Sequence, residues 1–204
     1  MRFPAVLLAA AFAGAVLPRP ARAEVFHDAE VKQPGNFEIS FEGQAEFDPE
    51  TKPDHRVYAR AGVGLFDRTE LDAKLGTLNP SANYFGAEVR YGAIENGDGY
   101  PALMPYLGAH WIDRRRRSEK DYGGVDAGLT ISETIFEQSW YAGYDVDADF
   151  IPELTRILFT QRIYAGVKIP MSEHLSFFVE GGYGIRNAIR VPRNYLSGGV
   201  ALFF

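Results

Sequence analysis

From residue 36 onward, the chain consists mainly of segments in which apolar residues alternate with polar or small ones. In 36–47, for example, Phe37 and Ile39 fall on one face, and Glu38 and Ser40 on the other. A period of two is the pattern of a strand with one apolar and one polar face. Similar segments lie at 57–65, 85–93, 103–111, 125–131, 140–149, 157–169, 175–186 and 195–204. The pattern predicts an all-β protein.

The polar face of these segments favours one all-β architecture. Alternating stretches of about ten residues between turns are typical of membrane barrels, although a soluble sandwich alternates in the same way. Here the second face carries acids, bases, Gly and Tyr, as a polar lumen would. No apolar run after residue 23 approaches the roughly 20 residues of a spanning helix. We therefore predict a closed antiparallel transmembrane up-and-down β-barrel.

The number of strands has two solutions. Counting through residues 55–204 gives eight strands and makes Asp67–Ala82 the longest outer loop, if the C-terminus lies on the periplasmic side. Residues 24–54 then form an N-terminal segment whose strand at 36–47 has no place in the wall. Pairing that strand with 24–33 would give ten strands. Eight is the prediction, and ten is the alternative.

The beginning of the chain has the pattern of an export signal. Arg2 is followed by the apolar run Phe3–Leu17, and Ala21-Arg-Ala23 supplies a small-x-small cleavage site. This pattern is typical of a secretory signal peptide. We expect residues 1–23 to be removed by cleavage after Ala23.

Charge and cysteine content exclude several classes of protein. The formal net charge is −6, from 21 bases and 27 acids. Loss of Arg2, Arg19 and Arg22 with the signal peptide leaves 21 − 3 bases against 27 acids, a net −9. Such acidity argues against non-specific nucleic-acid binding. The chain has no cysteine, which excludes a disulfide scaffold and thiolate metal sites.

Two local motifs carry a resemblance to a known family. Tyr58-Ala-Arg-Ala-Gly-Val-Gly-Leu65 is Gly-rich and strand-like, and Pro105-Tyr-Leu-Gly-Ala109 follows a predicted periplasmic turn. Both resemble segments of small outer-membrane barrels of the OmpA/OmpX and opacity-protein type. The resemblance implies a monomer in the outer membrane of a Gram-negative bacterium, in contact with lipid and lipopolysaccharide. It also implies that Phe204, the final residue, is the signal read by the barrel-assembly machinery.

The polar faces of the predicted strands carry charges of both signs. An eight-stranded barrel is just wide enough for side chains to fill it, and a buried unpaired charge is very costly. We therefore predict a charge network that plugs the lumen, with His110 and Lys168 on the same faces. Its predicted members are Arg60, Glu88, Arg90, Asp126, Asp145, Asp147, Arg162, Glu180 and Arg186.

The densest acidic feature is Asp145-Val-Asp-Ala-Asp149. Alternate acids on one strand face could bind a hard cation or act as paired carboxylates in acid–base chemistry. Their spacing of about 7 Å along a strand is wide for sharing one ion. We therefore interpret them as partners of lumen Arg and Lys residues, and we predict no metal, cofactor or catalytic site.

The predicted outer rim carries a basic run. Arg114, Arg115, Arg116 and Arg117 follow Trp111, and their guanidinium groups could bind lipopolysaccharide phosphates or could belong to a solvated loop. Trp111 and Trp140 both lie near predicted strand ends, where interface aromatics are expected.

These features predict a non-catalytic barrel that acts in envelope integrity or surface interaction. A narrow solute or ion channel is an alternative, favoured if ten strands close around a gap. A second alternative is an enzyme acting on lipid A, because His174-Leu-Ser176 resembles the His-x-Ser of outer-membrane lipid A deacylases. That motif falls at a predicted periplasmic turn, without the family's acid in the following strand. A soluble lipocalin-like binder is the alternative outside the membrane. It would need an apolar interior, and the Arg, Asp and Glu residues on the polar faces argue against one.

Overall fold

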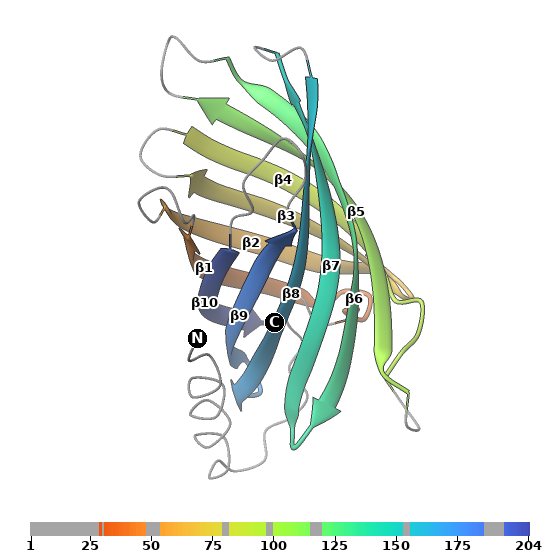
Figure 1. The fold of residues 1–204 in the computed structure, drawn as a ribbon. Coiled ribbons are helices and arrows are strands. Elements are labelled where there is room, and N and C mark those ends of the chain that lie inside the picture. The colour runs from red at the N-terminus through yellow and green to blue at the C-terminus, as the bar shows by residue number, and fades with distance from the viewer. Residues whose placement is uncertain are drawn as a thin grey trace.

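Ten antiparallel strands within the described residues close into one barrel (Figure 1). The computed structural model describes residue 29 and residues 31–47, 54–78, 82–96, 100–114, 120–152, 156–185 and 194–204. The strands are β1 (Phe37–Phe47), β2 (Asp54–Phe66), β3 (Thr69–Leu78), β4 (Ala82–Tyr91), β5 (Ala102–Arg114), β6 (Tyr122–Ile135), β7 (Gln138–Ile151), β8 (Arg156–Ser172), β9 (Leu175–Ile185) and β10 (Asn194–Phe203). The predicted closed all-β barrel is confirmed.

No helix in the described part of the chain is long and apolar enough to cross a membrane.

The preferred count of eight strands is wrong, because two further strands complete the wall. β1 lies between β2 and β10, so that Phe41 pairs with Ala59 on one side and with Val200 on the other. Both edges of β1 are therefore occupied, and most of the predicted partner 24–33 lies outside the described residues. The second addition is β3, which occupies most of the predicted outer loop Asp67–Ala82 and pairs with β2 and β4.

The two ends of the barrel differ in the connections between their strands. We call the end that holds Phe204 the turn end, because three of its connections are the two-residue turns Asp67–Arg68, Phe136–Glu137 and Glu173–His174. β4 ends and β5 begins at this end too, and 97–99 of the longer segment between them lie outside the described residues. The strands are joined at the opposite end, which we call the far end, by segments of which 48–53, 79–81, 115–119, 153–155 and 186–193 lie outside the described residues.

Polarity in the barrel is inverted relative to a soluble protein. Every strand presents large apolar side chains outward, and these are exposed: Phe41, Val57, Leu75, Phe85, Leu107, Val125, Phe150, Phe159, Phe177 and Leu196, in strand order. Every strand also buries a polar side chain inward: Glu38, Arg60, Asp72, Arg90, His110, Thr130, Asp149, Lys168, Glu180 and Ser197. The alternation in the sequence therefore separates an apolar outer surface from a polar lumen.

The last residue closes the seam between the first and last strands. The Phe204 backbone N–H donates to the Phe37 carbonyl at 2.9 Å, and the Phe37 N–H donates to the Phe204 carbonyl at 3.2 Å. Their rings lie 6.3 Å apart between centroids. Phe204 thus extends the β1–β10 ladder by one further pair.

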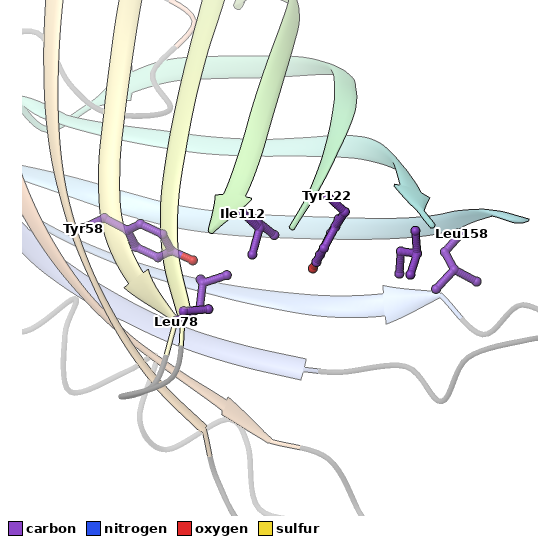
Figure 2. Packing of buried hydrophobic residues seen from close by; sticks show 7 residues of the cluster. Tyr58, Leu78, Ile112, Tyr122 and Leu158 are labelled. Carbon is purple, nitrogen blue, oxygen red and sulfur yellow. The ribbon is translucent and has the colours of Figure 1, made fainter. Parts of the chain in front are cut away.

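An apolar layer lies inside the wall. It is built from Tyr58, Leu78, Ala82, Ile112, Tyr122, Ile151 and Leu158, which come from successive strands β2 to β8. Figure 2 shows these side chains as a row across neighbouring strands. Tyr84 packs against this row and also stacks on His110, with 5.6 Å between ring centroids. The charged part of the lumen is therefore bounded by an apolar layer.

Candidate functional site: the barrel lumen

A short N-terminal segment crosses the inside of the barrel near the turn end. We call Ala29 and Val31–Asn36 the strap. The Ala29 N–H donates to Ser132 Oγ on β6 at 3.0 Å. The Gly35 N–H donates to the Gly64 carbonyl on β2 at 3.0 Å, and the Gly64 N–H donates to the Asn36 carbonyl at 3.1 Å. Because three strands of the wall separate β2 from β6, the strap spans the lumen.

The strap is closely packed against the wall. A Cβ added at Gly64 would lie 2.2 Å from the carbonyl oxygen of Gln33 and 2.5 Å from that of Lys32. At its other end, Ala29 belongs to a buried cluster with Ala102 and Met104 of β5. Glycine is required at position 64 because the strap backbone occupies the space of a side chain.

Lys32 places a cation of the strap among acids of the wall. Its side chain is only 3% exposed and forms an ion pair with Glu70 on β3. Its Nζ also lies 3.4 Å from Glu38 Oε2 on β1, and its backbone N–H donates to Glu70 Oε2 at 3.2 Å. Burial alone would lower the pKa of Lys32, but the carboxylates of Glu38 and Glu70 raise it above the ordinary value of 10.5. Lys32 is therefore charged at neutral pH.

The ion pairs continue from Lys32 into the wall. Arg60 Nε donates to Asp72 Oδ1 at 2.8 Å, and Arg90 Nε lies 2.9 Å from Asp72 Oδ2. Arg90 Nη2 also pairs with Glu88 at 3.0 Å. We call this set the turn-end cluster; its members are Lys32, Glu38, Arg60, Glu70, Asp72, Glu88 and Arg90. Three bases face four acids, so the buried charges nearly cancel.

A second group of charges, the His110 cluster, is formed by β5, β6 and β7. His110 Nδ1 lies 3.3 Å from Asp126 Oδ1 and 3.6 Å from Asp147 Oδ1. The other ring nitrogen, Nε2, lies 2.9 Å from Asp149 Oδ1. Both nitrogens of one imidazole are thus engaged by carboxylates from neighbouring strands.

Arg162 of β8 borders the His110 cluster. Its Nη2 lies 2.8 Å from Asp145 Oδ2 and 3.0 Å from Asp147 Oδ2. Four carboxylates on β6 and β7 therefore surround one guanidinium and one imidazole. The side chains of Asp147 and Arg162 are each 22% exposed, against 3% or less for Lys32, Arg60 and Asp72. The lumen is accessible to solvent here and sealed beside the strap.

Most of the predicted lumen residues fall into these two clusters. Arg60, Glu88 and Arg90 belong to the turn-end cluster, whereas Asp126, Asp145, Asp147 and Arg162 lie in or beside the His110 cluster. Glu180 accepts a hydrogen bond from the Tyr195 hydroxyl. Arg186 lies outside the described residues.

The predicted rim and interface residues are only partly described. The Arg114 guanidinium lies over the Tyr122 ring at 4.7 Å from its centroid, and 115–117 lie outside the described residues, as do the predicted signal peptide 1–23 and its cleavage site. Trp111 is exposed near the end of β5, and Trp140 is near the start of β7. The two tryptophans thus lie toward opposite ends of their strands.

Four charged residues of the turn-end cluster were missed by the sequence reasoning. Glu70 and Asp72 were assigned to a loop, although they alternate with Leu71 and Ala73 as strand residues do. Glu38 lies on the strand that had no assigned place. Lys32 precedes every alternating segment, and no local pattern identifies it as a lumen residue.

The His174-Leu-Ser176 motif is split by the fold. His174 is exposed in the turn between β8 and β9, whereas Ser176 is buried on the lumen face of β9.

No protein-family model and no curated protein matches the chain. Among solved structures, the N-terminal β-barrel domain of Pseudomonas aeruginosa OprF is similar at 16% identity and a TM-score of 0.40, over 85% of this chain and 100% of that one. The KdgM porin is similar at 11% identity and a TM-score of 0.46, over 81% and 99%. The translocator domain of the autotransporter NalP from Neisseria meningitidis is similar at 10% identity and a TM-score of 0.46, over 83% and 88%. With TM-scores below 0.5, the fold assignment rests on the strand pairing of this chain itself.

Proposed function

We propose that the protein is an integral, non-catalytic β-barrel of the bacterial outer membrane with a closed lumen, acting in envelope integrity or surface interaction. The observation that carries this proposal is the inverted polarity of the wall. All ten strands expose large apolar side chains and bury polar ones. Soluble proteins rarely expose contiguous apolar patches above a few hundred Å², whereas lipid requires such a surface.

A structural rather than transporting role is supported by the interior. The strap spans the lumen near the turn end, and Lys32 binds it to Glu38 and Glu70. A non-catalytic role is supported by His174 and Ser176, of which one is exposed in a turn and the other is buried in the lumen.

We propose partners on the basis of the apolar outer surface, the basic run that begins at Arg114, and Phe204. The apolar wall would contact lipid, and the basic run Arg114–Arg117, which begins at the last residue of β5, would bind lipopolysaccharide phosphates through guanidinium groups. Phe204 would be read by the barrel-assembly machinery. A closed barrel has no free strand edge to pair with another chain, which supports a monomer.

The proposal is tested by fractionation and electrophoresis. We expect the protein to stay in the membrane pellet after alkaline carbonate extraction and to migrate faster when unheated than when boiled. Release by buffer alone, with one mobility under both conditions, would contradict membrane integration. In planar bilayers, the purified protein should show no discrete openings. Frequent openings of the wild type would contradict the closed lumen while leaving the membrane barrel intact.

A narrow channel is the second candidate, and two observations favour it. Ten strands enclose a wider lumen than eight, and Asp147 and Arg162 are partly solvent-accessible inside it. In this alternative the strap is the closing element and must leave before ions pass. The same bilayer recordings separate the candidates, because a channel opens in the wild type under some applied voltage.

A further inference from the structure

The His110 cluster has the dimensions of a metal site. His110, Asp126 and Asp147 come from three neighbouring strands, and one possible ligand atom from each lies within 4.8 Å of the other two. Two ligand atoms bound tetrahedrally at about 2.1 Å from one ion lie about 3.4 Å apart. Nδ1 lies 3.3 Å from the first oxygen and 3.6 Å from the second. Two of the three ligand pairs are therefore spaced as they would be around one tetrahedral ion, and the third pair lies within 4.8 Å.

His110 and Asp147 are each oriented by a second contact, made through the atom that would not bind the metal. The Nε2 of His110 faces Asp149 Oδ1 at 2.9 Å, the arrangement in which a carboxylate orients a metal-binding imidazole. The Oδ2 of Asp147 accepts a hydrogen bond from Arg162 at 3.0 Å, which leaves its Oδ1 directed at His110. Orientation of this kind is what a metal ligand needs and what a simple ion pair does not require.

The neighbouring strands leave space for these ligands by means of glycines. His110 pairs across strands with Gly124, and Asp126 pairs with Gly108. A Cβ at Gly124 would lie 2.4 Å from His110 Nε2, and a Cβ at Gly108 would lie 2.3 Å from Asp126 Oδ2. Two ligand side chains thus lie in cradles that any residue larger than glycine would fill.

The charge of the cluster favours a bound cation. Asp126, Asp145, Asp147 and Asp149 face the guanidinium of Arg162 and the imidazole of His110. Uncompensated charge inside a barrel is costly. A divalent ion bound to Asp126 and Asp147 would place positive charge among these carboxylates. The partial exposure of Asp126 and Asp147 gives the ion a solvent-accessible side.

We propose that His110, Asp126 and Asp147 bind one divalent transition-metal ion of the Zn²⁺ class inside the lumen, and that Asp149 is a positioning residue for His110. One imidazole nitrogen and two carboxylate oxygens suit such an ion, whereas Ca²⁺ prefers six to eight oxygens and Mg²⁺ an octahedron of them. Three protein ligands leave a position for water. The proposed metal site requires only the described barrel interior, so it would stand even if the proposed role in the envelope were wrong.

The test is calorimetric titration of ZnCl₂ into tag-free, detergent-purified protein with Mg²⁺ in excess. We expect one ion per chain. Asp126→Asn and His110→Gln should each weaken binding by at least about 100-fold, because each removes a ligand, and Asp149→Asn should weaken it by about 10- to 100-fold. The matched control is Asp145→Asn, which removes one negative charge from β7 without removing a ligand. Its effect measures the contribution of charge alone and should be clearly smaller than that of Asp126→Asn.

Two results would overturn the site: no saturable Zn²⁺ binding by the wild type, or an equal loss in Asp145→Asn and Asp126→Asn, which would indicate non-specific attraction to acidic residues. Heat-dependent mobility shows whether each variant is folded. X-ray absorption of the zinc-loaded wild type provides a readout that needs no variant. It should show one coordinated imidazole, and a spectrum with oxygen ligands alone would contradict the role of His110.

Discussion

At the scale of single residues, the lumen is shaped by tyrosines that cover glycines on the neighbouring strand. Five such pairs lie directly across from each other: Tyr58–Gly76, Tyr106–Gly128, Tyr141–Gly166, Tyr164–Gly143 and Tyr195–Gly182. In each, the ring occupies the space in which a Cβ would stand. A narrow barrel can hold large rings because the facing residues have no side chain.

This arrangement predicts a cost for adding one methyl group at a lumen glycine. In Gly128→Ala, the new Cβ would lie 2.4 Å from the Tyr106 ring, so the ring must move within a crowded interior. We expect the free energy of unfolding to fall by about 1–3 kcal/mol, measured by urea denaturation in detergent. Gly181→Ala is the control, because its nearest neighbouring atom would be 3.8 Å away. Equal losses in both variants would show that ring packing is not the cause.

Phe204 is the second residue with a specific prediction. Its backbone exchanges two hydrogen bonds with Phe37, and its exposed ring would also be the assembly signal under the proposed function. Deletion of Phe204 should reduce the amount of heat-modifiable protein in the outer membrane, whereas Phe204→Tyr should reduce it less. If the deletion leaves that amount unchanged, Phe204 has no role in assembly.

At the scale of elements, the strap differs most from the strands, because one lysine holds it among acids. Lys32→Met removes the cation and leaves Glu38 and Glu70 buried beside each other. Removing one partner of a buried ion pair costs about 3–5 kcal/mol, and we expect a loss of unfolding free energy of that order. Lys74→Met is a matched control: Lys74 is more exposed and lies 3.7 Å from Glu42, so its loss should be smaller.

The difference in unfolding free energy between the wild type and Lys32→Met should depend on pH, because the pKa of Lys32 is raised in the folded protein. Because that pKa is raised in the folded state above 10.5, the contribution of Lys32 is fully present below the unfolded value. It is lost only as the pH rises through the folded value. The stability difference between wild type and Lys32→Met should therefore be constant from neutral pH to about pH 9 and should shrink at more alkaline pH. A difference that shrinks between neutral pH and about pH 9 would contradict charged Lys32 as the cause.

A turn provides the remaining prediction at this scale. Phe136 and Glu137 have φ values of 51° and 65°, the left-handed region that two-residue hairpins of type I′ require at both positions. Replacing the pair by Asn-Gly should raise the free energy of unfolding by about 1 kcal/mol, because both new residues tolerate positive φ. The same replacement at Glu173–His174, for which no positive φ is recorded, should not stabilise the protein.

At the scale of the whole molecule, periodicity alone predicts most of the wall. Nine of the ten strands contain an alternating segment recognised from the sequence, and Phe37/Glu38 or Val125/Asp126 face outward and inward as predicted. β3 was missed because it follows the two-residue turn Asp67–Arg68 directly, so that strand and turn read together as one polar loop. The eight-strand prediction made the strand before Asp67–Ala82 run away from the end that holds Phe204. With β3 in the wall, β2 runs toward that end. The strap and the meeting of His110 with three aspartates depend on strand register, which period-two alternation does not specify.

The closed state of the whole barrel should depend on the fit of the strap. Gly64→Ala places a Cβ 2.2 Å from the backbone oxygen of Gln33, and backbone cannot rotate away as a side chain can. The strap must therefore shift, although no charge of the lumen changes. We expect discrete openings in planar bilayers from Gly64→Ala and none from the wild type. Gly43→Ala, where the added Cβ would have its nearest neighbouring atom 4.0 Å away, should remain closed. If folded, heat-modifiable Gly64→Ala is as silent as the wild type, the strap is not what closes the lumen, and the ion pairs of the wall must close it on their own.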